Sequence, residues 1–193
     1  MKAILEAARE QFLLTGVRRT SADDIARRAG INRATLYRRV GTKEDVVRAT
    51  YLHETQRVLA VIEEEIGDVP SPGDPGFDPA AYIERFFTVT VTQLRENALL
   101  RQLLEIDPDE TLAGLTVRAG DTLALAAALV GDRIAKLRAY AGNAEVTDID
   151  DLAATFARLA QSLVLTPDAP PRLDSPARMR AYARRVVVPL VLG

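Results

Sequence analysis

Apolar residues recur at steps of three and four along nearly the whole chain, and this spacing constrains the fold more than any other feature. Ile4, Ala8 and Phe12 follow it near the N-terminus, and Leu152 and Phe156 follow it near the C-terminus. Such spacing places apolar side chains on one face of an α-helix. The alternating pattern of a half-buried strand is scarce. The sequence therefore predicts an all-α fold.

Short helices are predicted in the first fifty residues, because glycines and hydroxyl residues mark their ends. Gly16 offers the left-handed conformation that ends a first helix, and Gly30 ends the second. Before the second helix, Thr20 and Ser21 are each followed three residues later by an acid. This is the pattern of a helix N-cap.

A third short helix and a long fourth helix are predicted from the same kinds of signal. Asn32 is a good N-cap for the third helix, and Gly41 ends it. Thr42 and the acids that follow it repeat the cap pattern. The fourth helix is therefore expected to begin there and to run to about Ile66.

The remainder is predicted to be helical after one clear break. Residues 67–77 contain three prolines and three glycines, so this segment is expected to be a surface loop. Later helices are expected from Pro79 to about Asn97, from Ala98 to Glu105, from Pro108 with a bend near 118–120 to Tyr140, after caps at Thr147 and Asp148, and from Ser175 to an end or kink at Pro189.

The charge is unevenly distributed along the chain. Residues 1–50 hold 11 Lys and Arg against 6 Asp and Glu, a balance of +5, whereas the remaining residues carry −7. A basic head on an acidic body is typical of a protein whose head binds a polyanion. Ordinary local fluctuation explains the difference equally well, so charge alone does not decide the function.

Several classes of protein are disfavoured by what the sequence lacks. It has no cysteine and one histidine, His53, so neither a nucleophile–base pair nor a metal site can be assembled from these residue types. The acids at 63–65 and at 148, 150 and 151 could in principle hold magnesium, but they are more simply interpreted as residues of helix ends and exposed helix faces. We therefore expect no enzyme, cofactor or metal. No apolar run approaches the roughly 20 residues of a membrane span, and the N-terminus lacks a signal-peptide pattern, so a cytoplasmic protein is expected.

Two short helices joined by a glycine-containing turn, after a longer first helix, are the parts of a helix-turn-helix. Residues 20–44 read TSADDIARRAGINRATLYRRVGTKE, and this stretch resembles the head of the TetR family of bacterial regulators. The resemblance covers roughly residues 3–50. Family members often carry Gly where Ala34 stands, and His then Phe where Arg39 and Val40 stand. The domains expected are a helix-turn-helix domain at 1–46 and a helical ligand-sensing and dimerisation domain at 47–193.

The head is expected to bind double-stranded DNA. Arg33, Ala34 and Thr35 occupy the first turn of the third helix, which faces base edges, and arginine can bind guanine through two hydrogen bonds. The full set of candidate DNA-binding residues is Thr20, Ser21, Asn32, Arg33, Ala34, Thr35, Tyr37, Arg38, Arg39 and Lys43. Simpler alternatives are that Thr20, Ser21 and Thr42 serve only as caps, and that Tyr37 is a half-buried core aromatic.

The resemblance implies a homodimer in which the last two helices of each subunit form a four-helix bundle. The candidate interface residues are Leu152, Phe156, Leu159, Leu163, Met179, Tyr182 and Val186. A small-molecule effector is expected among the helices from 79 to 143. The residues expected to contact it are Tyr82, Phe86, Phe87, Thr90, Gln93, Leu103, Thr122 and Leu125. An ordinary core is the alternative in both regions.

The function expected is a transcriptional repressor that binds a palindromic operator as a dimer and is released by a small molecule. A ligand can act only through its different affinities for two conformations of the protein. Activation is the alternative outcome of the same scheme. Two other possibilities are a helical adaptor whose head binds protein, and a DNA-binding regulator without a small-molecule ligand.

Overall fold

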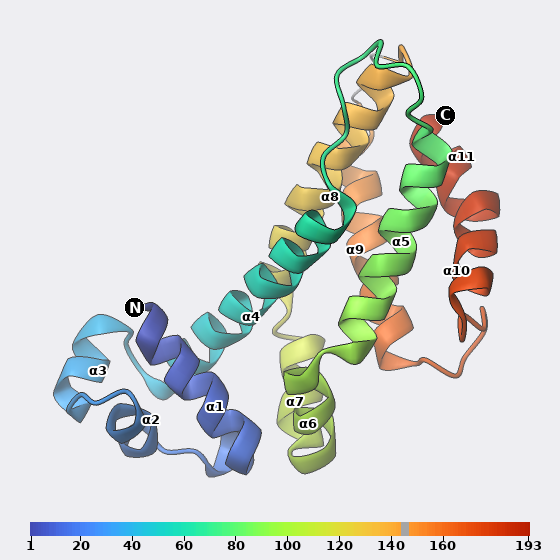
Figure 1. Cartoon of the computed structure of the whole chain (residues 1–193). Helices are drawn as coiled ribbons and strands as arrows, with labels where there is room; N and C mark the ends of the chain where they lie inside the picture. Colours follow the sequence, from blue (N-terminus) through green and yellow to red (C-terminus); the bar gives the residue numbers. More distant parts are fainter. Residues whose placement is uncertain (144–146) are drawn as a thin grey trace. The chain divides into compact units, whose positions relative to one another are not determined.

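The computed structural model describes residues 1–143 and 147–193, and all regular elements in these ranges are helices (Figure 1). The elements are α1 (Lys2–Arg19), α2 (Ala22–Arg28), α3 (Arg33–Arg39), α4 (Lys43–Ile66), α5 (Pro79–Glu96), α6 (Ala98–Ile106), α7 (Pro108–Leu115), α8 (Gly120–Tyr140), α9 (Ile149–Leu165), α10 (Pro176–Tyr182), a π-helical turn (Ala183–Val187) and α11 (Val188–Leu192). The predicted all-α fold is confirmed.

Internal contacts divide the chain into two units. Unit 1 comprises residues 1–57 and 96–122, and unit 2 comprises residues 58–95 and 123–193. Unit 1 thus adds α6, α7 and the first residues of α8 to the helices of the head. This division describes packing, whereas the expected boundary between residues 46 and 47 describes function and stays a prediction.

Unit 1 is built around a core to which five helices contribute. Phe12 of α1, Ile25 of α2 and Val46 of α4 have no exposed surface, and Leu36 of α3 is 1% exposed. Leu103 of α6 belongs to the same cluster. Full burial of side chains of this size contributes about 1.5–3 kcal/mol each, so this core fixes α3 to the rest of unit 1.

The predicted caps of the head are largely confirmed. Ser21 accepts a hydrogen bond from the Asp24 amide at 3.1 Å and donates its own amide to the Asp24 carboxylate at 3.0 Å. Asn32 caps α3 by accepting from the Thr35 amide at 2.8 Å. Thr42 accepts from the Asp45 amide at 3.2 Å, while its own amide donates to the Asp45 carboxylate. Each of these bonds satisfies an otherwise free backbone amide.

Two expectations for the first helix and its end need correction. Thr20 does not cap the N-terminus of α2: it follows α1 directly, its buried hydroxyl donates to the Gly16 carbonyl at 2.6 Å, and Ser21 caps α2 instead. Gly16 leaves helical geometry with a φ of +78°, but α1 resumes and ends at Arg19. Gly16 therefore marks a kink. Any larger residue there is strained, and a Cβ would lie 3.0 Å from the Cβ of Asp107.

Unit 2 has an apolar core and two buried arginines. Ile62, Ile83 and Ile134 form part of the core. Arg133 is buried and pairs with Glu63 at 2.9 Å and with Asp68. Arg138 is buried as well. It donates to the Val191 carbonyl at 2.9 Å and pairs with Asp148. Such charges are tolerated in an interior because they are paired and hydrogen-bonded.

The loop at 67–77 and the helices after it follow the predicted course with one exception. The loop at 67–77 and the starts of α5, α6 and α7 lie where the sequence places them. Asp148 is the first flanking residue of α9, but its carboxylate binds Arg138 and does not cap the helix. Near Pro189 the helix widens, and the Val188 amide donates to the Ala183 carbonyl five residues back. The chain thus stays helical through Pro189 to Leu192 with a widened turn before it, and the predicted kink at this proline stays a prediction.

Within the described part of the chain, no single helix is both long and apolar enough to cross a membrane. The bent pair α7 and α8 meets the criteria of length and composition only when the two are taken together.

Candidate nucleic-acid interface and effector region

Helix α3 presents most of the predicted DNA-binding side chains to solvent. Leu36 is its only buried residue and anchors one face in the core of unit 1. Arg33, Ala34, Tyr37, Arg38 and Arg39 are exposed on the remainder of the helix, and Thr35 is half-buried. The structure therefore brings these six residues together on one short helix.

Arg33 is held by two neighbours. Its guanidinium donates to the Asp23 carboxylate at 3.0 Å and to the Tyr37 hydroxyl at 3.1 Å, and it lies 5.3 Å from the centre of the Tyr37 ring. The hydrogen bond to Tyr37 and the charge of Asp23 raise the pKa of Arg33. Arg33 therefore carries its charge over the whole physiological range and has a preferred direction.

Other candidate residues are differently placed. Ser21 is exposed and caps α2, and Asn32 is exposed and caps α3. Arg38 donates to the Thr35 hydroxyl at 3.4 Å. Thr20 is 1% exposed, so its side chain is part of the interior of unit 1. The DNA-binding role of all these residues stays a prediction.

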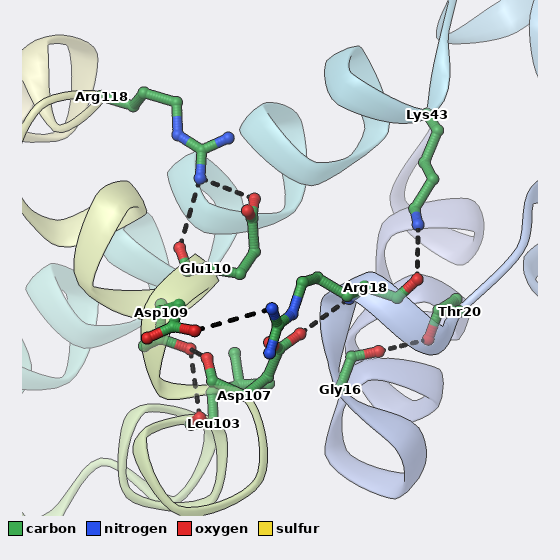
Figure 2. A network of polar contacts seen from close by, with 10 residues as sticks. Gly16, Arg18, Thr20, Lys43, Leu103, Asp107, Asp109, Glu110 and Arg118 are labelled. Carbon is green, nitrogen blue, oxygen red and sulfur yellow. Dashed lines mark hydrogen bonds and ion pairs between the residues drawn. The ribbon is translucent and has the colours of Figure 1, made fainter.

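A polar network that the sequence did not reveal joins α1 to the α6–α7 junction (Figure 2). Asp107 is 3% exposed and accepts two hydrogen bonds from Arg18, one from its amide at 2.7 Å and one from its Nε at 2.6 Å. Lys43 donates to the carbonyl of the same Arg18 at 3.2 Å. The N-terminal residue of α4 is thus linked to Asp107 through one arginine.

A pocket of about 560 Å³ lies in unit 1 beside this network. Its lining includes Arg18, Lys43, Arg48, Tyr51 and Thr122. Burial raises the pKa of the Tyr51 hydroxyl to about 12, so this group stays protonated at physiological pH. Thr122, one of the residues predicted to contact the effector, lines this pocket and lies in unit 1.

The predicted effector residues are divided between the two units. Leu103 belongs to the core of unit 1, as its 1% exposure shows. Tyr82, Phe86, Thr90 and Gln93 lie along one face of α5 in unit 2 because they are three or four residues apart. Phe87 is on the same helix, and Leu125 is a half-buried residue of α8. The eight residues do not form one group.

The α5 face changes from aromatic to polar along its length. The Tyr82 and Phe86 rings are stacked with centres 6.5 Å apart, and the Tyr82 hydroxyl donates to the Gly67 carbonyl at 3.0 Å. Burial raises the pKa of this hydroxyl. The Thr90 hydroxyl is buried and has no hydrogen-bond partner among the described residues. Gln93 donates to Glu65 at 3.0 Å.

The predicted dimer residues are divided between core and surface. Leu163 and Met179 are 5% exposed and pack in a small cluster of unit 2, so they already have partners within the chain. Val186 is 37% exposed. The others, Leu152, Phe156, Leu159 and Tyr182, are half-buried. Their role in dimerisation stays a prediction.

Comparison with known proteins identifies the head and the fold. Residues 4–50 match the family described as bacterial regulatory proteins, tetR family. An uncharacterized HTH-type transcriptional regulator of Mycobacterium tuberculosis is 28% identical over 189 residues, which cover 97% of this chain and 83% of that protein. The HTH-type transcriptional regulator TtgR of Pseudomonas putida is 32% identical over 105 residues, covering 53% of this chain and 46% of TtgR.

Two solved structures have the same fold over nearly the whole chain. The TetR family repressor AlkX from Dietzia has a TM-score of 0.70 at 19% identity, covering 98% of this chain and 93% of AlkX. The transcriptional repressor QsdR of R. erythropolis has a TM-score of 0.66 at 19% identity, covering 100% and 93%. These relatives are regulators and not enzymes. The head of this protein is therefore a TetR-family DNA-binding domain, and the chain is a DNA-binding transcriptional regulator.

Proposed function

We propose that the protein is a cytoplasmic, homodimeric repressor that binds a palindromic operator and is released by a small molecule. The observation that carries the proposal is the state of α3: Leu36 anchors it in the core, while Arg33, Ala34 and Tyr37 remain exposed. A rigid helix with exposed arginine, small and aromatic side chains suits insertion into a major groove. Repression is supported by the description of AlkX and QsdR as repressors.

The proposed effector site lies along the α5 face of unit 2. Thr90 supports this choice, because a buried hydroxyl without a partner costs about 1–3 kcal/mol and is expected where a ligand supplies the missing bond. Phe86 and Phe87, one turn earlier, provide apolar surface. An apolar site with a few polar groups is the usual composition of a small-molecule site. The effector is therefore expected to be mainly apolar with at least one hydrogen-bonding group.

The mechanism is a two-state one. In a twofold dimer two α3 helices must lie about 34–36 Å apart to enter successive major grooves. Effector binding favours a conformation in which this separation no longer fits. The factor by which the effector lowers operator affinity is set by the ratio of the effector's affinities for the two conformations.

Selection from a pool of random duplex DNA, followed by sequencing, tests the DNA-binding proposal. The expected result is enrichment of a palindrome with half-sites about one helical turn apart, with affinity that falls steeply between two salt concentrations. Absence of enrichment, or binding insensitive to salt, would favour the adaptor alternative.

The effector proposal is tested with the selected operator and a collection of small molecules. Compounds that raise the melting temperature of the protein are added to the operator complex, and release is followed by fluorescence anisotropy. A Thr90→Val variant, which removes the hydroxyl and preserves the shape, is expected to weaken a hydrogen-bonding effector by about tenfold. Release unchanged in this variant would place the effector elsewhere.

A further inference from the structure

Asp23 of α2 is the carboxylate that contacts Arg33, the first residue of α3. The two oppositely charged groups are 3.0 Å apart, and their side chains are similarly exposed, at 58% and 57%. Tyr37 accepts from the other terminal nitrogen of the guanidinium at 3.1 Å. The arginine is thus held from two sides at the exposed end of the helix that the proposed function assigns to the major groove.

We propose that Asp23 is a positioning residue that directs Arg33 towards a guanine and so sets the base preference of the protein at one position of its operator. This inference rests on the proposed role of α3. Asp23 acts through Arg33. It accepts a hydrogen bond from one terminal nitrogen and leaves other N–H groups of the guanidinium free. These suit the O6 and N7 acceptors that guanine presents in the major groove.

The carboxylate also explains how such an arginine avoids non-specific binding. An unrestrained arginine side chain rotates freely and reaches phosphate oxygens, which carry no sequence information. Asp23 holds the guanidinium back, and its own negative charge is repelled by phosphates. Loss of the carboxylate is therefore expected to strengthen binding to arbitrary DNA while it weakens discrimination between bases.

Tyr37 has a complementary part in this arrangement. Its hydroxyl is occupied by Arg33 in the DNA-free protein. When the tyrosine contacts a phosphate, as the proposed function expects, it leaves Arg33 and frees one terminal nitrogen for the base. Asp23 remains as the restraint during this exchange.

The chain provides a matched control in the Glu10–Arg28 pair of α1 and α2. The pair is separated by 3.1 Å, and the Glu10 side chain is 57% exposed, nearly the same as Asp23. Neither residue belongs to α3. Glu10→Gln therefore removes one exposed, arginine-paired carboxylate from unit 1 without touching Arg33.

The experiment compares the full-length wild type with Asp23→Asn, Glu10→Gln, Arg33→Lys and the double variant Asp23→Asn/Arg33→Lys. Each is titrated against the duplex enriched from the random pool and against duplexes in which single guanines are replaced. Asp23→Asn is expected to lose about tenfold in discrimination at one guanine position, the position at which Arg33→Lys also loses it. Addition of Asp23→Asn to Arg33→Lys is expected to have no further effect there.

The outcomes separate this inference from the proposed function. If Arg33→Lys changes the preference at a guanine and Asp23→Asn does not, or does so no more than Glu10→Gln, the inference is overturned and the proposed function stands. If neither the wild type nor any variant distinguishes the duplexes, both fail.

A second measurement needs no DNA. The N–H resonances of the terminal guanidinium nitrogens of Arg33, followed by NMR, are expected to exchange with water faster in Asp23→Asn than in the wild type and Glu10→Gln. An unchanged exchange rate would contradict the positioning role even if the affinities changed. Circular dichroism checks that α2 is intact, and Asp23→Glu is expected to restore part of the discrimination.

Discussion

Helices α2 to α4 and helices α8, α9 and α11 fix their polar ends in different ways. In the first group each helix is capped by its own neighbour in sequence: Ser21, Asn32 and Thr42 bind amides three residues ahead. In the second group a buried arginine, Arg138, binds the Val191 carbonyl 53 residues away and pairs with Asp148. The N-termini of α2 to α4 are therefore fixed by bonds within one turn, whereas these helix ends of unit 2 are fixed by a buried arginine of another helix.

The largest effect that sharpens this comparison is expected from Arg138→Met. The substitution keeps the volume but removes the bonds to Val191 and Asp148, so the free energy of unfolding is expected to fall by about 3 kcal/mol. Arg178→Met is the control in unit 2, because Arg178 is exposed and pairs with Asp174 four residues away. Its expected cost is below about 0.5 kcal/mol. Chemical denaturation measures both, and equal costs would break the comparison.

Asp107→Ala is expected to have the next largest effect. It removes a carboxylate that is 3% exposed and leaves the Arg18 amide without its acceptor, while the exposed guanidinium keeps Asp109 nearby, and about 2 kcal/mol of stability is expected to be lost. Unit 1 thus contains long-range polar contacts as well as local ones, and Arg9–Glu54 is another of them. The amides of α1 and α6 are expected to exchange with deuterium faster in this variant. Unaltered exchange would show that the Arg18–Asp107 contact is not needed to hold α1 and α6.

Loss of a single cap is expected to cost less. Ser21→Ala and Asn32→Ala should each lower the free energy of unfolding by about 1 kcal/mol, the usual value for such a residue. Thr20→Val, in contrast, removes a buried hydroxyl bond to the Gly16 carbonyl and does not uncap α2. Amide exchange in the first turn of α2 distinguishes the two cases. Faster exchange there in Thr20→Val would contradict the assignment of the cap to Ser21.

The smallest effect concerns pH. Hydrogen bonds from the Ser21 side chain and amide lower the pKa of Asp24 below its ordinary value. A carboxylate with a lowered folded-state pKa stabilises the fold above its unfolded pKa, about 3.9, and loses this contribution as pH falls through the folded value. The cost of Ser21→Ala is therefore expected to be constant from pH 7 to about 5 and to shrink below pH 4. A cost that stays constant to pH 3 would contradict it.

These contrasts explain which features the sequence could predict. Helix ends at Ser21, Asn32 and Gly41 depend on residues within one turn, so a local pattern identifies them. The Arg18–Asp107 contact joins residues 89 apart, and no local signal announces it. Asp148 was expected to cap α9, but its carboxylate binds the buried guanidinium of Arg138 instead, which offers two charge-assisted hydrogen bonds at once.

The candidate site shows the same limit. Exposed residues of α3 could be predicted because the motif fixes their register around Leu36. Apolar periodicity marked Leu103 as buried, but it cannot tell a core side chain from a ligand-binding one, and this residue packs in unit 1. The contact between Asp23 and Arg33 crosses from one helix to the next and depends on their packing.

The ratio of affinities for the enriched palindrome and for a scrambled duplex of the same length and composition, at one salt concentration, tests most directly whether α3 reads DNA sequence. We expect a ratio of about 1,000 or more for the wild type, reduced by roughly tenfold in Arg33→Lys. A ratio near one for the wild type, or one unaffected by Arg33→Lys, would contradict it.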